Sequence, residues 1–100
     1  MMRVIAVCAE PERSATRYGD RGRHLYCLQD TASAVTHIFL AAVDMGLATC
    51  WVGAFDDDEV SRVISLPPNL RPVALLPIGY AAQSPNPRPR RSLAEVSRTV

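Results

Sequence analysis

Apolar residues occur in short runs along the 100-residue chain, and polar segments separate these runs. The first run, RVIAVCA at 3–9, is rich in β-branched residues and stops at Glu10-Pro11, which predicts a buried strand. Residues 11–24 are mostly polar and include two glycines. We therefore expect a surface loop or lid after the first strand.

The clearest helical pattern lies at 30–46, where apolar residues recur every three or four positions. Asp30 is expected to cap this helix, because its carboxylate can accept a hydrogen bond from a free first-turn N–H. Gly46 is expected to end it, since the left-handed C′ position favours glycine. One side of the helix carries small residues that would let another element approach closely, namely Ala32, Ser33, Ala41 and Ala42.

A second strand and a second helix follow this first helix. The strand is expected at 48–55, in the sequence ATCWVGAF. Either Asp56 or Asp57 is expected to cap the helix, which then continues to Leu66 and ends before a Pro-Pro pair. Acidic residues in the first turn suit the positive end of the helix dipole.

The last part of the chain combines an apolar strand with a proline-rich tail. The almost entirely apolar segment 71–81 predicts a strand that is covered on both faces. Pro77 within this segment indicates an edge position or an irregularity, because proline cannot donate to a ladder. Residues 84–100 are expected to form an extended tail. The predicted order is therefore β-α-β-α-β plus a tail.

Length and charge narrow the classes of function. One hundred residues fit one small domain spanning 1–100. Eleven basic and ten acidic residues give a net charge of +1, which argues against a general nucleic-acid binder. No apolar stretch approaches the roughly 20 residues that span a bilayer, and the first residues do not resemble a signal peptide. Three cysteines without metal-ligand spacing argue against a zinc site and suit a reducing cytoplasm.

Side chains for conventional catalysis are few. His24 and His37 are interpreted as a surface residue and a helix residue, and the acids at 56–59 as capping residues rather than metal ligands. Gly53-Ala54 would end the second strand with small residues, which let a backbone N–H approach a flat ligand. A flavin needs little more, because its ring supplies the reactivity. A simple turn at the end of the strand is the alternative interpretation.

Several motifs in order resemble one protein family. They are the alanine-rich helix from Asp30, GLATCWVGAF, Leu-Pro at 66–67, RPVALLPIGY, and an arginine-containing tail that ends in LAEV. Together they resemble the C-terminal half of FMN-dependent oxidoreductases of the nitroreductase family. The preceding ERSATRYGDRGRHLYCLQD resembles the loop before this helix in one branch of that family.

The resemblance implies a fold, a cofactor and an assembly. The expected fold is α+β, nitroreductase-like, with a mainly antiparallel sheet flanked by helices. The family forms an intertwined homodimer that binds FMN at the subunit interface. The backbone of Gly53 and Ala54 would face N5 and the neighbouring edge of the flavin. Trp51 and Val52 would support that segment, and Phe55 would anchor it in the core.

A further part of the implied site lies in the tail. Arg88 and Arg90 would match a basic pair that binds the FMN phosphate, since guanidinium groups suit phosphate oxygens. A solvated, flexible end is the alternative for this segment. The family's other FMN contacts come from an N-terminal half. This chain starts at a strand in the middle of that architecture, so we expect it to be truncated at the N-terminus.

The implied activity is an FMN-dependent oxidoreductase, which uses NAD(P)H to drive hydride transfer to nitro, quinone or similar conjugated acceptors. One alternative is a non-catalytic, truncated module that dimerises or binds a small ligand without stable FMN. Another is a complex in which a separate chain supplies the N-terminal half. Neither nucleic acid nor a membrane is expected as a partner.

Overall fold

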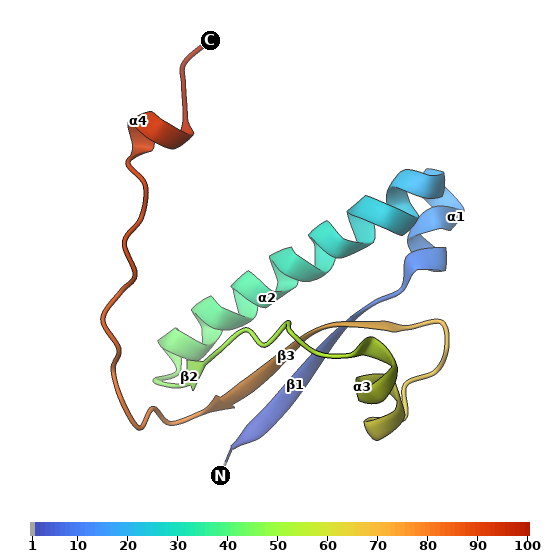
Figure 1. The fold of residues 1–100 in the computed structure, drawn as a ribbon, viewed down its shortest axis with the longest axis horizontal. Helices are drawn as coiled ribbons and strands as arrows, with labels where there is room; N and C mark the ends of the chain where they lie inside the picture. Colours follow the sequence, from blue (N-terminus) through green and yellow to red (C-terminus); the bar gives the residue numbers. More distant parts are fainter. Residues whose placement is uncertain (1) are drawn as a thin grey trace.

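The computed structural model describes residues 2–100. Its elements follow one another along the chain as β1 (Arg3–Ala9), α1 (Pro11–Arg21), the π-helical turn η1 (Gly22–Tyr26), α2 (Cys27–Asp44), β2 (Ala48–Thr49), α3 (Asp57–Val63), β3 (Arg71–Gly79) and α4 (Leu93–Val96). The long helix α2 runs along the sheet, and α4 stands apart at the end of the tail (Figure 1). Within residues 2–100, no helix has the length and apolar character needed to cross a membrane.

The sheet has the order β1-β3-β2, and both pairings are antiparallel, which confirms the predicted α+β class. β3 therefore lies at the centre of the sheet rather than at an edge. The second strand is shorter than predicted: it pairs at Ala48–Thr49 and then only through a bridge between Val52 and Leu75. Continuing this register places Cys50 opposite Pro77. Because proline has no N–H to donate, the ladder is interrupted there, as the predicted irregularity implies.

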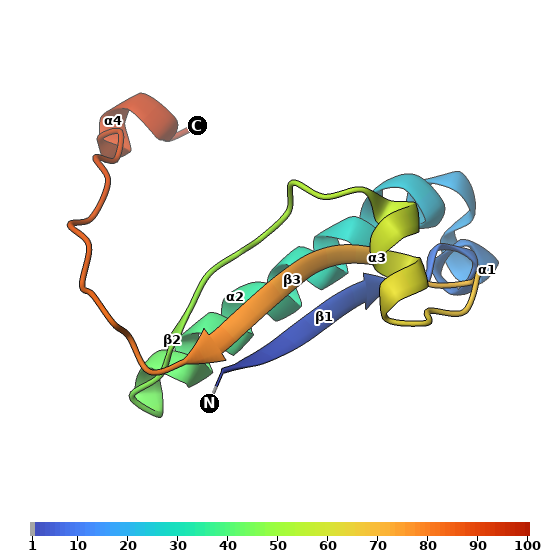
Figure 2. The same ribbon diagram turned by 60° about the horizontal axis from the view of Figure 1, so that its bottom comes forward.

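A small core lies between α2 and one face of the sheet. Val35, Ala74 and Leu76 have no exposed surface, and Ile5 packs against them from β1. The opposite face is less covered, since Val73 and Leu75 are only half-buried and Val4 is exposed. The expectation that β3 is covered on both faces is therefore wrong within this chain. Helix α3 lies beside β3 near the end of this face (Figure 2).

The loop or lid expected at 11–24 is instead helical. Pro11 fits the first position of α1, where its missing N–H is not needed. Gly19 has a φ of 61°, which allows the chain to turn before η1. A Cβ on Gly22 would lie 2.6 Å from the carbonyl oxygen of Ser14, so the absence of a side chain allows α1 to pack closely on η1. Polar helices of this kind lack the apolar periodicity that the prediction used.

The first boundary of α2 also differs from the prediction. The helix begins at Cys27, and Tyr26 before it already has helical dihedrals, so Asp30 lies inside the first turn and caps nothing. The other end is confirmed: Gly46 has a φ of 74°, and the Leu47 N–H donates to the Ala42 carbonyl over 2.8 Å. This is the Schellman arrangement that glycine favours.

The remaining elements follow the sequence more closely. The Asp56 carboxylate caps α3 by accepting from the Glu59 N–H over 2.9 Å, although the helix ends at Val63, before the predicted Leu66. The strand predicted to 81 ends at Gly79. The tail is extended until Ser92, which caps the short helix α4 through a capping box that the prediction did not foresee.

Candidate functional site

The segment 51–55 leaves the sheet edge and leads to α3. Val52 is fixed by two hydrogen bonds with Leu75, of 3.0 and 2.9 Å. Four residues after Val52, Asp56 is fixed by its cap of α3. Between these points Gly53 and Ala54 are exposed, and no acceptor within residues 2–100 takes their N–H groups. The segment therefore presents two adjacent backbone donors between two anchored positions.

Trp51 supports this segment from the side of α2. Its ring makes an edge-to-face contact with Phe39, at 6.3 Å between centroids and an interplanar angle of 82°. Such pairs stabilise by about 0.5–1.5 kcal/mol beyond area burial. The indole is still 42% exposed. Trp51 is therefore held by Phe39 on one side and open on the other, and it lies next to the free N–H groups of Gly53 and Ala54.

Gly53 is not required by the packing of this chain. A Cβ at this position would meet only Trp51, at 3.4 Å from Nε1, and the residue does not have the positive φ that favours glycine. Phe55, which was expected to anchor the segment in the core, is half-buried. A small residue at 53 is explained if a flat group approaches the backbone from outside the chain.

Two of the four acids after this segment have structural partners. Besides the cap made by Asp56, the carboxylate of Asp57 accepts from the Nε of Arg71 over 3.2 Å and links α3 to the start of β3. Capping therefore accounts for Asp56 and an ion pair for Asp57, while Asp58 and Glu59 are exposed. No group of three or more histidine, cysteine or acidic side chains that could hold a metal occurs within residues 2–100.

The tail arginines lie apart from the segment 51–55. Arg88 and Arg90 are exposed, and Arg90 donates only to the neighbouring carbonyl of Pro89, over 3.3 Å. The tail carries both residues away from the sheet and α2 in both views (Figures 1 and 2). A single chain thus brings Trp51, Val52, Gly53 and Ala54 together, but it does not bring the two arginines to them.

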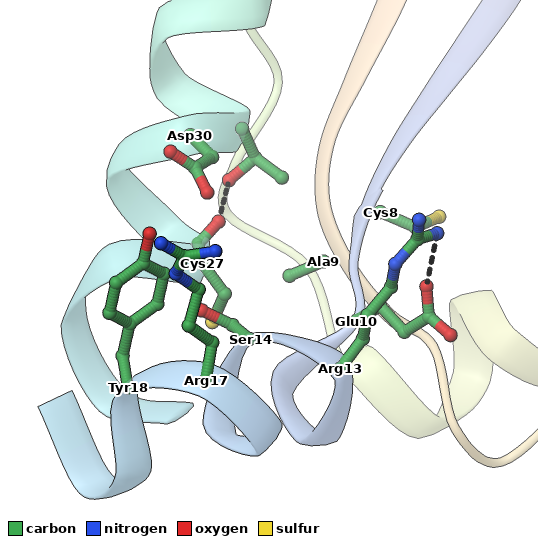
Figure 3. Close-up of a pocket in the computed structure, with 10 residues that line it drawn as sticks. Cys8, Ala9, Glu10, Arg13, Ser14, Arg17, Tyr18, Cys27 and Asp30 are labelled. Atoms are coloured by element: carbon green, nitrogen blue, oxygen red, sulfur yellow. Dashed lines mark hydrogen bonds and ion pairs between the residues drawn. The ribbon is translucent and has the colours of Figure 1, made fainter. Parts of the chain in front are cut away.

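Sequence reasoning missed a hollow of about 360 Å³ where β1, α1 and α2 meet (Figure 3). Arg13 and Arg17 line it from α1, and Asp30 lines it from α2. The four-residue spacing of the arginines was the available clue, because it places both on one side of a helix. Burial raises the pKa of Cys8 at one end of the hollow, so its thiol is held in the protonated form.

Comparisons with known proteins agree with this geometry. The sequence profile of the Nitroreductase family matches residues 2–80. A curated protein of Methanocaldococcus jannaschii named "Putative nitroreductase MJ1384" is 33% identical over 76 residues, which cover 76% of this chain and 37% of that protein. A second curated relative, from Methanothermobacter thermautotrophicus, is 31% identical and is covered over 35% of its length. The chain thus spans little more than a third of these relatives.

Solved structures of similar fold are also described as nitroreductase family proteins. One from Clostridium difficile 630 superposes with a TM-score of 0.79 at 33% identity, over 95% of this chain and 57% of that one. Another, from Clostridium novyi NT, has a TM-score of 0.66 at 40% identity, over 77% of this chain and 41% of that one.

Proposed function

Because the chain belongs to the nitroreductase family, we propose that its oxidoreductase role is FMN-dependent, with NAD(P)H as reductant and nitro, quinone or similar conjugated compounds as acceptors. The observation that carries this proposal is the pair of exposed N–H groups of Gly53 and Ala54, which have no acceptor within residues 2–100. Hydrogen-bond donors in an ordered segment next to an aromatic ring suit the edge of a planar heterocycle.

The roles of the residues follow from their placement. Gly53 and Ala54 would donate to the N5 edge of the ring, and their small side chains would let the ring approach the backbone. Through its bridge to Leu75, Val52 would fix the position of these two N–H donors relative to the sheet. Trp51, braced by Phe39, would limit movement of the segment. When bound, FMN supplies the redox-active ring that takes up hydride from NAD(P)H and passes reducing equivalents to the acceptor.

We propose that Arg88 and Arg90 serve the phosphate end in a dimer. Their guanidinium groups could form charge-assisted, bidentate hydrogen bonds with phosphate oxygens. Since the tail turns away from its own segment 51–55, the arginines would act in a site shared with a second subunit. The tail helix supports this assembly: Leu93 is 81% exposed and Val96 is also exposed, so its apolar side chains have no cover in this chain.

A non-catalytic module without stable FMN is the second candidate. It is favoured by the course of the tail, which carries Arg88 and Arg90 and runs away from the sheet and α2. In this case the chain would dimerise or bind a small ligand. A separate chain that carries the remaining family contacts would instead restore FMN binding, and co-purification of such a chain with this one would reveal it.

The test compares FMN with riboflavin, which has the same ring but no phosphate. Titration of the full chain should show FMN binding by visible absorbance and calorimetry. The double variant Arg88→Gln/Arg90→Gln should weaken FMN binding about a hundredfold, because two charge-assisted contacts are lost. Riboflavin binding should change less than about twofold.

Arg98→Gln is the matched control for this test, since Arg98 is also an exposed tail arginine. It should leave the binding of both ligands unchanged. Failure of the chain to take up FMN would contradict the enzyme hypothesis and support the module. An equal loss of FMN and riboflavin binding would contradict the phosphate role of the two arginines, because it would show that they support binding of the ring.

A further inference from the structure

The hollow between β1, α1 and α2 contains no residue of the segment 51–55 or of the tail. The buried residues Ala9, Cys27 and Thr31 line its interior, so its base is mostly apolar. Its volume of about 360 Å³ equals that of about a dozen waters at ~30 Å³ each. The space is large enough for a molecule of about a dozen non-hydrogen atoms.

Three polar side chains around this hollow have no partner within residues 2–100. Arg17 forms no ion pair, Asp30 forms neither an ion pair nor a side-chain hydrogen bond, and the Ser14 hydroxyl has no recorded hydrogen bond. Arg23, nearby in η1, behaves differently, because it pairs with Glu12 over 2.7 Å and also with Asp20. Arg17 and Asp30 thus face the hollow without an ion-pair partner among residues 2–100, whereas other charged side chains in this region are paired.

The charges lie on two sides of the hollow, with one arginine and one acid on each side (Figure 3). Arg17 and Asp30 lie on one side, where they extend from α1 and α2, and Ala9 lies between them and the other side. There Arg13 and Glu10 are paired with each other at 3.6 Å. The guanidinium of Arg17 lies 5.5 Å from the ring centroid of Tyr18, a cation–π contact that limits its freedom.

These charges select the class of ligand. The two arginines and two acids around the hollow sum to zero, so a phosphate-rich anion would meet repulsion from the acids, and a polyamine would meet it from the arginines. A guanidinium and a carboxylate that face the same space without pairing suit a molecule that carries both charges on neighbouring atoms. An α-amino acid has this arrangement.

We propose that the hollow binds a small α-amino acid. Its carboxylate accepts hydrogen bonds from Arg17 and the Ser14 hydroxyl, and its ammonium group donates to Asp30. The side chain lies over Ala9 and is uncharged, because the Arg13–Glu10 pair at the far side already neutralises itself. Arg17 and Asp30 are both exposed, so screening by solvent keeps the affinity modest.

The experiment titrates the full chain with L-leucine and with two analogues that each lack one charged group. Isoamylamine lacks the carboxylate, and 4-methylpentanoate lacks the ammonium. Amide NMR spectra should show saturable shifts for Ser14, Arg17 and Asp30 on addition of leucine. Each analogue should bind at least about tenfold more weakly, since one charge-assisted contact is lost.

Two variants assign the charges to the two ends of the ligand. Arg17→Gln should weaken leucine binding about tenfold and abolish the preference for leucine over isoamylamine. Asp30→Asn should have the same size of effect and abolish the preference over 4-methylpentanoate. Arg21→Gln is the matched control, because Arg21 lies on the same helix but bonds to Tyr26 instead of lining the hollow.

Three results would overturn the proposal. They are no saturable shifts with leucine up to tens of millimolar, equal binding of 4-methylpentanoate and leucine, and unchanged affinity in both variants. Equal binding of the acid would show a simple anion site instead. None of these measurements uses flavin, so the outcome is independent of whether the chain binds FMN.

Discussion

The two faces of the sheet differ in how far this chain completes them. On the face under α2, the side chains of Val35, Ala74 and Leu76 are fully enclosed. On the opposite face and at the sheet edge, Val4 is 58% exposed, and Trp51 remains partly open despite its contact with Phe39. Soluble domains normally cover the apolar side of each layer. The face under α2 forms a complete core, whereas the opposite face and the sheet edge leave apolar surface that a partner or a ligand could cover.

This difference separates two kinds of sequence feature. Residues that build the core are explained by contacts inside the chain, and their removal should affect stability. Gly53, Ala54, Arg88 and Arg90 make few such contacts, so their removal should affect binding and leave folding almost unchanged. A set of paired substitutions, one on each side of this division, can test whether it holds.

The largest effect is expected for truncation in the core. Leu76 is 0% exposed, and Leu76→Ala should lower the free energy of unfolding by about 2–5 kcal/mol through lost burial and a new cavity. Leu40 on α2 is 66% exposed, so Leu40→Ala should change the free energy of unfolding by less than about 0.5 kcal/mol. Urea unfolding followed by circular dichroism measures both. Similar losses in the two variants would show that the exposed side of α2 is buried in an assembly.

A pair of glycines gives the second comparison. Gly22→Ala would place a Cβ 2.6 Å from the Ser14 carbonyl oxygen, and the resulting overpacking should destabilise the chain by about 1–3 kcal/mol. At Gly53 the nearest atom would be 3.4 Å away, so Gly53→Ala should change the unfolding free energy by less than about 0.5 kcal/mol. Thermal unfolding measures both variants. Equal destabilisation would contradict the claim that Gly53 is free of internal packing.

The same division explains what the sequence could predict. The boundaries marked by Gly46 and Asp56 were found because each depends on a local backbone requirement that a single residue type meets. Asp30 was misassigned as a cap because η1 continues directly into α2, and a helix without a free end needs no cap. The helices at 11–26 were missed because α1 buries no residue and its side chains are mostly polar, so the sequence has no apolar period there.

Only part of the candidate site could be predicted from the sequence. The segment 51–55 was located because small residues at the end of a strand are a local feature. Its relation to Arg88 and Arg90 depends on where the tail goes, and nothing in the tail's own sequence determines that. The hollow beside Asp30 depends on α1 folding back against η1 at the start of α2, which the prediction of a loop could not supply.

A smaller effect on the free energy of unfolding is expected at Thr49, which lies in the edge strand β2. Its hydroxyl oxygen is buried and has no hydrogen-bond partner among residues 2–100. Thr49→Val keeps the shape and removes the unpaired group, so it should raise the free energy of unfolding by up to about 1 kcal/mol. Chemical denaturation checks this sign. A loss of stability would show that the hydroxyl finds a partner in an assembly.

The smallest effect concerns pH, and it compares Glu12 in the folded body with Glu95 in the tail. A hydrogen bond from Arg23 lowers the pKa of the Glu12 carboxyl, and hydrogen bonds from Ser92 lower the pKa of Glu95. Each carboxylate thus stabilises its folded surroundings above the unfolded pKa of about 4.3. That contribution is lost as the pH falls through the lower, folded-state pKa.

Only Glu12 should influence global unfolding, because it joins α1 to η1, whereas Glu95 acts inside the exposed helix α4. Glu12→Gln should therefore lower the unfolding midpoint at about pH 6 and lose this difference from the wild type at about pH 3. Glu95→Gln should match the wild type throughout. Both side chains are exposed, so added salt should shrink the Glu12 effect. A pH-dependent difference for Glu95→Gln as large as that for Glu12→Gln would show that α4 is docked on the folded body or on a partner.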